Sequence, residues 1–150
     1  MTFPYQVVKG IDDRTFKIYE KVLPWLKVTV FNPDNPEKGV SVFCLADTGS
    51  DLTFFTSEIG VYLGYEIHSG KKVKLNGIGG GVQEASFFER VGIRIGNLEF
   101  IGMMGFISDG FPLFSPQQTG ILGTTGFFRN ANVCFSYPTE MKVTANLNLN

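Results

Sequence analysis

Short segments of alternating apolar and polar residues, broken by glycine and proline, run through most of this 150-residue chain. Between Leu26 and Val30 every second residue is apolar, and Val91, Ile93 and Ile95 repeat the pattern. Alternation with period two predicts half-buried strands, because successive side chains of a strand point to opposite faces. Glycine supplies 18 residues, well above the usual share of about 7%, which favours many tight turns. We therefore expect a mainly β chain.

The pattern predicts one domain over residues 1–150 with one or two short helices. A helix is expected from Ser57 to Leu63, with Gly64 at its end, and a helical turn around Thr125–Arg129. Gly96-Asn97 predicts a hairpin turn. The expected strands are residues 26–31 and 40–46 (joined by a long polar loop), 71–75 and 82–95 (one long ribbon), 98–107, 133–137 and 141–149.

Charge and cysteine content exclude several classes of protein. Thirteen basic residues against 14 acidic ones leave no broad basic surface, so a nucleic-acid partner is not expected. The chain has no apolar stretch of 18 residues and no secretory signal at Met1–Gly10, so we expect no membrane partner and a cytoplasmic location. Cys44 and Cys134 are isolated thiols, and His68 is the only histidine. Neither a metal site nor a cofactor is expected.

The segment Leu45-Ala46-Asp47-Thr48-Gly49-Ser50-Asp51 is the sharpest chemical feature. An apolar strand ends directly at an acid, so the Asp47 carboxylate should stand at the edge of a rigid, buried element. Gly49 lets the backbone turn close beside that carboxylate. A turn closed by an Asp side chain is a common structural reason for such a tripeptide. The residues around it therefore decide its meaning.

Those surroundings resemble the retropepsin-like aspartic proteases, the single-lobe relatives of the pepsins that act as homodimers. Three blocks match in order: Asp47-Thr48-Gly49 after an apolar strand, the glycine-rich tip at residues 77–81 in the place of the family's flap, and Ile121-Leu122-Gly123 before the family's helix. The blocks lie within residues 26–137, most of the chain. The resemblance implies a single-lobe acid-protease fold: a closed β barrel with a flap hairpin.

The resemblance also implies a mechanism and a set of site residues. Two carboxylates in contact share one proton and can activate a water molecule to hydrolyse a peptide bond. Asp47 is the one aspartate that follows an apolar strand and precedes Thr-Gly, so a second chain must supply its mate. The implied catalytic residues are Asp47, Thr48 and Gly49, and the implied substrate-binding residues are Ser50, Asp51, Ile78, Gly79, Gly80, Gly81 and Ile121.

Within that set each residue has an implied role. Thr48 ties the two active-site loops together across the dimer axis, and Gly49 accepts the substrate backbone. Ser50 hydrogen-bonds the catalytic carboxylate, and Asp51 reaches the substrate main chain. The glycine-rich tip closes over the peptide as a lid, and Ile121 lines a side-chain pocket or belongs to the ordinary core.

The sequence departs from the retroviral pattern after Gly123. Retroviral members place Arg-Asn or Arg-Asp there, and this chain has Thr124 and Thr125. The arginine helps to hold the retroviral dimer together, so the dimer contact here must differ. Residues 138–150 are expected as a C-terminal strand, which either frays or pairs across the dimer. Residues 1–25 are either an extra strand or a removable pro-segment.

Two functions from different classes remain open at this point. The first is an aspartic endopeptidase that binds extended peptides between its flap and its floor. The second is a non-catalytic peptide-binding or dimerisation module with the same fold. Completion of the site by a different protein is a further alternative to the homodimer.

Overall fold

The computed structural model describes residues 1–76, 82–107 and 118–146. The expected flap residues Ile78, Gly79, Gly80 and Gly81 lie outside the described residues, as do residues 147–150 of the expected C-terminal strand.

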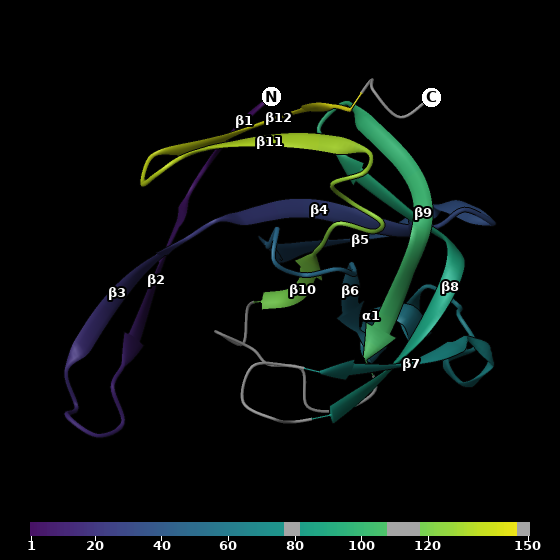
Figure 1. The fold of residues 1–150 in the computed structure, drawn as a ribbon, viewed down its shortest axis with the longest axis horizontal. Coiled ribbons are helices and arrows are strands. Elements are labelled where there is room, and N and C mark those ends of the chain that lie inside the picture. Colours follow the sequence, from purple (N-terminus) through teal and green to yellow (C-terminus); the bar gives the residue numbers. More distant parts are fainter. Residues whose placement is uncertain (77–81, 108–117, 147–150) are drawn as a thin grey trace.

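Within the described residues, the main sheet has seven strands in the spatial order β4-β5-β10-β6-β9-β8-β7. Because β4 also pairs with β8, the pairings close a ring of strands, and β7 extends from it (Figure 1). The predicted mainly β class is confirmed; of the predicted closed barrel, the structure shows this ring. The strands are β4 (Trp25–Asn32), β5 (Asn35–Ala46), β6 (Phe54–Thr56), β7 (Lys71–Asn76), β8 (Val82–Ile95), β9 (Leu98–Ile107) and β10 (Gln118–Leu122).

The β4–β5 hairpin is longer than the alternation predicted. Its strands run to Asn32 and from Asn35, so the expected long polar loop is wrong. The Asn32 side-chain oxygen accepts the Asp34 N–H at 3.0 Å and closes a tight turn, as Asn side chains often do. At the β8–β9 hairpin the expected Gly96-Asn97 turn is present, with Gly96 at a φ of 56°.

The helix predicted at Ser57 is confirmed, and the second helical turn is not. Helix α1 spans Ser57–Tyr62 and is followed by Gly64 at a φ of 84°; a short 3-10 helix, η1, spans Ile67–Ser69. Around Thr125–Arg129 the structure has turns instead of a helix. Gly126 has a φ of 94°, which lies outside the right-handed helical region and interrupts the expected turn.

Two apolar clusters are buried in the described residues. The larger one fills the ring and includes Leu26, Val30, Phe55, Ile93, Phe106, Leu122 and Phe127. The smaller one is formed by side chains of four neighbouring strands, β10, β6, β9 and β8, and consists of Phe54, Ala85, Phe87, Ile107 and Ile121. Partly buried Leu45, Leu52, Val73 and Leu75 pack against it.

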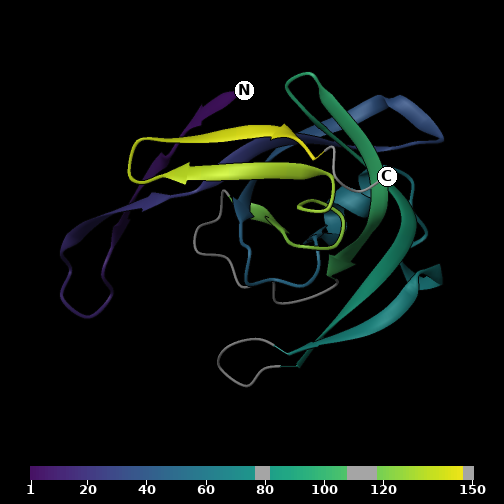
Figure 2. The ribbon, with the colours of Figure 1, turned by 45° about the horizontal axis from the view of Figure 1, so that its top comes forward.

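The two ends of the described chain meet in a separate small sheet. Its order is β1-β12-β11, with β1 at Thr2–Pro4, β11 at Ala131–Ser136 and β12 at Glu140–Ala145. Strands β2 (Gln6–Ile11) and β3 (Ile18–Leu23) form another hairpin, which extends away from the rest of the molecule (Figures 1 and 2).

Candidate active site

Asp47 stands directly after β5, a strand that lies between β4 and β10. The buried Ala46 donates its N–H to the Pro24 carbonyl oxygen at 2.9 Å, and Asp47 donates its own N–H to the Leu122 carbonyl oxygen at 3.0 Å. The backbone at Asp47 is therefore held from both sides. This is the rigid placement at a strand end that the sequence predicted for the Asp47 carboxylate.

The residues after Asp47 form a tight turn around its side chain. Asp47 Oδ1 accepts the Gly49 N–H at 2.9 Å, and the Asp47 carbonyl oxygen accepts the Ser50 N–H at 3.2 Å. Asp47 is half-buried, whereas Thr48 and Gly49 are exposed. The Asp47 side chain thus closes its own turn, and the turn presents Thr48 and Gly49 to the outside.

The segment after β10 runs alongside the segment after Asp47. Thr124 N–H donates to the Ser50 carbonyl oxygen at 2.8 Å, and Thr125 N–H donates to the Asp51 carbonyl oxygen at 2.9 Å. Leu52 and Thr125 form an isolated parallel bridge. The Asp47 and Gly123 motifs, more than 70 positions apart in the sequence, are therefore one structural unit.

Gly123 is required by this close approach. A Cβ at position 123 would stand 2.7 Å from the Ser50 carbonyl oxygen and nearer still to the Leu52 carbonyl group. Backbone atoms held by their own hydrogen bonds cannot move aside as the end of a flexible side chain can. The glycine of the third matching block, Ile121-Leu122-Gly123, is therefore required by packing in this chain.

Thr53 is a site-positioning residue that the sequence interpretation missed. Its side chain is fully buried and its hydroxyl both accepts from the Gly123 N–H at 2.9 Å and donates to the Gly123 carbonyl oxygen at 3.2 Å. The Thr53 carbonyl oxygen also accepts the Gly105 N–H at 3.0 Å. A single hydroxyl between the apolar residues Leu52 and Phe54 was the available signal.

The other predicted site residues take different positions. Ser50 donates its hydroxyl hydrogen to the Leu52 carbonyl oxygen at 2.8 Å; a hydroxyl has one hydrogen, so in this structure Ser50 does not donate to Asp47. Asp51 is exposed at the rim of the turn. Ile121 is 7% exposed and belongs to the smaller apolar cluster. The structure brings Asp47, Ser50 and Ile121 onto adjoining segments.

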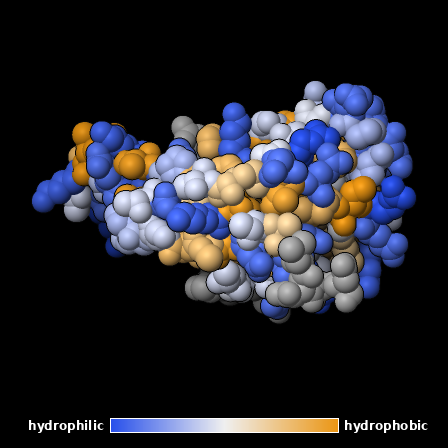
Figure 3. All heavy atoms as spheres, turned by 90° about the horizontal axis from the view of Figure 1, so that it is seen from above, coloured by the Kyte–Doolittle hydropathy of each residue, from blue (hydrophilic) through white to orange (hydrophobic). Residues whose placement is uncertain are grey.

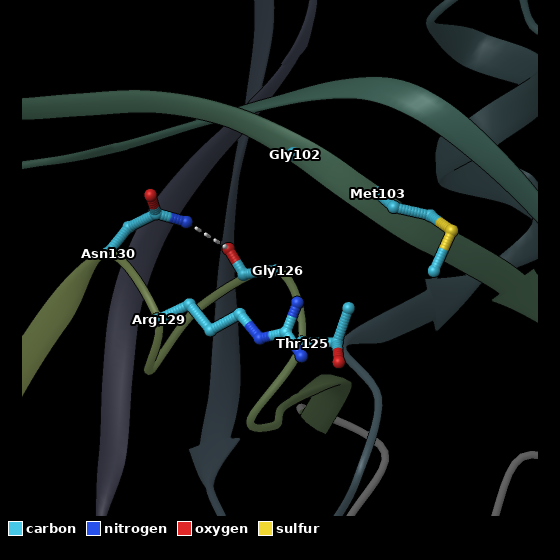
Figure 4. A pocket seen from close by; sticks show the side chains of 6 residues that line it. All are labelled: Gly102, Met103, Thr125, Gly126, Arg129 and Asn130. Atoms are coloured by element: carbon cyan, nitrogen blue, oxygen red, sulfur yellow. Dashed lines mark hydrogen bonds between the residues drawn. The ribbon is translucent and has the colours of Figure 1, made fainter. Parts of the chain in front are cut away.

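An open pocket of about 620 Å³ lies behind the Thr124–Asn130 turns. Figure 4 shows the Arg129 side chain reaching toward Thr125, with Gly102 and Met103 of β9 on the other wall. Asn130 donates to the Gly126 carbonyl oxygen at 3.4 Å (Figure 4). Asp47 is not among the lining residues, so this pocket is separate from the carboxylate.

Within the described ranges, no three His, Cys, Asp or Glu side chains are grouped so that they could hold a metal ion. A search of the same residues for a helix long and apolar enough to cross a membrane finds none.

Comparison with known proteins places the fold. Neither the scan against protein-family models nor the search of curated proteins finds a match. Among solved structures, a retropepsin-like aspartic protease from Rickettsia conorii is similar over 95% of this chain and 98% of its own, with a TM-score of 0.57 and 12% identity. The retroviral protease-like domain of Ddi1 from Leishmania major is similar over 86% of this chain and 100% of its own, with a TM-score of 0.50 and 14% identity.

These similarities show that the chain has the fold of the retropepsin-like aspartic proteases, as the sequence resemblance implied. The protease of EIAV, solved with the inhibitor HBY-793, is also similar, over 69% of this chain and 84% of its own, at 21% identity; its TM-score is 0.48, and the fold assignment does not depend on it.

Proposed function

We propose that this chain is an aspartic endopeptidase whose active site forms when two copies bring their Asp47 carboxylates together. The observation that carries the proposal is the placement of Asp47 on a retropepsin-like fold. Asp47 follows a central strand whose last residues alternate between buried and half-buried, its backbone is bonded to β10, and the Thr48-Gly49 turn beside it is exposed. Closing the turn at Gly49 needs only a side-chain oxygen, which asparagine would supply as well, so the turn alone does not account for a carboxylate here.

In the proposed mechanism, the two Asp47 carboxylates share one proton because like charges a few ångströms apart cannot both ionise. The ionised carboxylate takes a proton from a water molecule, and this water attacks the carbonyl carbon of the scissile peptide bond. The protonated carboxyl donates its proton to the carbonyl oxygen as negative charge develops there. The carboxyl that took the proton from water then passes it to the amide nitrogen as the C–N bond breaks, and a hydroxyl group of the intermediate returns a proton to the other carboxylate, which restores the shared proton.

The proposed substrate is a peptide in an extended conformation. Thr48 and Gly49 are exposed beside Asp47, which supports a role for Thr48 at the second copy and for Gly49 at the substrate backbone. Gly49 offers a surface without a side chain, so a peptide backbone can approach the carboxylate. Asp51 is proposed to bind the substrate main chain, and Ile121 to line a pocket for a substrate side chain. Residues 78–81 are proposed to close over the bound peptide.

In the single chain, Ser50 does not make the hydrogen bond to the catalytic carboxylate that the resemblance implies. Its hydroxyl donates to Leu52 in the single chain, so a hydrogen bond from Ser50 to the carboxylate requires a change of its side-chain rotamer. We propose that Ser50 holds the turn in the single chain and is available to Asp47 only after assembly.

A second candidate function is a non-catalytic module with the same fold. Thr124 and Thr125 favour it, because they stand where the retroviral pattern has Arg-Asn or Arg-Asp. Such a module would retain the paired backbone segments around Gly123 and would bind peptide without cleaving it.

The test is cleavage of a peptide library, read by mass spectrometry from acidic to neutral pH. Asp47→Asn keeps the size of the side chain and its ability to accept the Gly49 N–H, but it cannot supply a carboxylate. Asp34→Asn is the matched control, since it makes the same change in the turn at the other end of the β4–β5 hairpin.

Cleavage by the wild type and by Asp34→Asn, lost in Asp47→Asn, supports the endopeptidase. Equal cleavage by all three proteins would contradict it. Peptide binding by the wild type without any cleavage would favour the non-catalytic module.

A further inference from the structure

We propose that the β2–β3 hairpin, Gln6–Leu23, is an arm by which this chain binds a second copy of itself. The inference rests on the proposed function in one respect: it names the element that joins the two chains of the active dimer. It assigns to the first 25 residues a role in assembly of the site.

The arm stands apart from the rest of the described chain. β2 and β3 form a two-stranded sheet of their own and pair only with each other. Figure 2 shows the hairpin projecting from the body, and Figure 3 shows it from above as the extension at the left. A lone two-stranded hairpin is at best marginally stable in water, so we expect the arm to be stabilised by packing against another protein surface.

The two faces of the arm differ. On one face Val7 lies opposite Val22 and Ile11 opposite Ile18, with the Lys9–Glu20 ion pair between them. Ile11 is 62% exposed and Ile18 is 76% exposed. We call this face, formed by Val7, Lys9, Ile11, Ile18, Glu20 and Val22, the docking face.

The opposite face is covered by its own side chains. The Tyr19 ring lies directly over Gly10, where a side chain would clash with it. Lys21 places its ammonium group 5.1 Å from the centre of the Tyr19 ring, in a cation–π contact. The exposed apolar side chains of the two strands therefore lie mainly on the docking face.

The tip of the arm adds an exposed aromatic side chain to an ordered turn. Asp12 Oδ1 accepts the Arg14 N–H at 2.9 Å and the Thr15 N–H at 2.8 Å, and the Asp12 carbonyl oxygen accepts the Phe16 N–H at 2.7 Å. Phe16 is 83% exposed and has a φ of 54°, a conformation uncommon for an aromatic residue. Apolar side chains gather at this far end of the arm in Figure 3.

The base of the arm identifies the second copy as the occupant. Pro24 follows β3 directly, and its carbonyl oxygen accepts the N–H of Ala46, the residue before Asp47. In a dimer that brings two Asp47 side chains together, the two-fold axis must pass beside Asp47. The arm therefore starts next to that axis, where a projecting hairpin meets the second copy.

Area and charge also fit a self-association surface. A standard interface buries about 800 Å² on each partner, and large apolar side chains such as Phe contribute on the order of 150–250 Å² each when buried. Val7, Ile11, Phe16 and Ile18 are each more than half exposed, so each arm offers apolar side chains to such an interface. The docking face carries one positive and one negative side chain at its centre, so a symmetric contact brings no excess of like charge.

The experiment measures dimer dissociation of the full chain by sedimentation equilibrium. The test variant, Ile11→Glu/Ile18→Glu, places two charges on the docking face. Both side chains are already exposed, so the fold should survive, and the thermal midpoint and circular dichroism check this. Val61→Glu is the matched control, because Val61 is an apolar residue of helix α1 that is 65% exposed.

We expect the dissociation constant to rise at least tenfold in the test variant and to stay unchanged in Val61→Glu. Equal dissociation constants in the wild type and the test variant would refute the proposed role of the arm in dimerisation. If the same wild-type protein cleaves peptides, the proposed endopeptidase activity would be unaffected by that result. A dimer that dissociates in the test variant but cleaves no peptide as wild type would support the role of the arm and refute the endopeptidase activity. A wild type that remains monomeric at millimolar concentration would overturn the arm.

Discussion

The Thr53 hydroxyl bonds both backbone polar groups of Gly123: Thr53 Oγ1 accepts the Gly123 N–H at 2.9 Å and donates to the Gly123 carbonyl oxygen at 3.2 Å. One buried side chain thereby joins the segment that follows Asp47 to the segment that follows β10. Because Asp47 itself is bonded to Leu122, this contact helps to set the position of the carboxylate without touching it.

Thr53→Val tests that contact. Valine has nearly the same shape but cannot bond either group, so the Gly123 N–H and carbonyl oxygen lose their buried partner. An unsatisfied buried polar group costs about 1–3 kcal/mol, and we expect a loss of about 2 kcal/mol or more in unfolding free energy, measured with urea. Thr144→Val, an exposed change on β12, should be nearly neutral. Equal stability of both variants would contradict the role of Thr53.

Gly123→Ala and Gly49→Ala form a second pair. The new Cβ at position 123 would meet the Ser50 and Leu52 backbone, whereas the one at position 49 would meet only Asp47 Oδ1, at 3.2 Å. Overpacking costs typically about 1–3 kcal/mol, and we expect the upper end of this range for Gly123→Ala and below about 1 kcal/mol for Gly49→Ala. If both variants lose activity but only Gly123→Ala loses stability, the proposed role of Gly49 at the substrate is supported. Wild-type stability of Gly123→Ala would be incompatible with the packing described here.

The elements that the sequence predicted best are those set by local signals. Period-two alternation located β4 and the end of β8, the Gly96-Asn97 pair located a hairpin turn, and Ser57 to Gly64 enclosed α1. At the candidate site, the apolar run into Asp47 correctly predicted a carboxylate directly after a strand, although only alternate residues at the end of that strand are buried. In each case the information lies within a few neighbouring residues.

The features that the sequence did not predict depend on distant contacts or on turn geometry. Thr53 and Gly123 are 70 positions apart, and nothing local to Thr53 shows that pairing. For residues 1–25 the sequence allows an extra strand or a pro-segment and does not show the β2–β3 hairpin. Asp12 closes the turn of this hairpin through side-chain bonds, and its two strands contain no buried residue. The expected helix at Thr125 failed because Gly126 takes a positive φ.

The reactivity of the two cysteine thiols tests how tightly the interior of the ring of strands is packed. Cys44 is fully buried on β5, which raises the pKa of its thiol, whereas Cys134 is exposed on β11. Since the thiolate is the reactive form, an aromatic disulfide reagent at mildly alkaline pH should modify one thiol quickly and the other only on unfolding. Cys134→Ser should remove the fast phase and leave the slow one. Two fast thiols in the native wild type would show that the core around Cys44 opens more readily than this packing implies.

Tyr65 makes stability depend on alkaline pH. Its hydroxyl donates to the Arg90 carbonyl oxygen at 2.7 Å, and its ring packs against Phe88 and Phe106. Burial, with the nearby Asp34 carboxylate adding to it, raises the pKa of Tyr65 to about 12. In the unfolded chain the phenol ionises near pH 10, so the unfolded state binds fewer protons between these values. The contribution of Tyr65 is therefore fully present below about pH 10 and is lost as the pH rises through about 12.

The measurement is absorbance at 295 nm during a pH titration of the folded protein. The difference between the wild type and Tyr65→Phe isolates the Tyr65 phenol, and we expect its midpoint near pH 12. In urea, the unfolding midpoint of the wild type should fall more steeply above about pH 10 than that of Tyr65→Phe. Tyr62→Phe, which removes an exposed phenol from α1, should leave that steeper fall in place. A Tyr65 phenol that titrates near pH 10 in the folded protein would contradict its burial against Phe88 and Phe106.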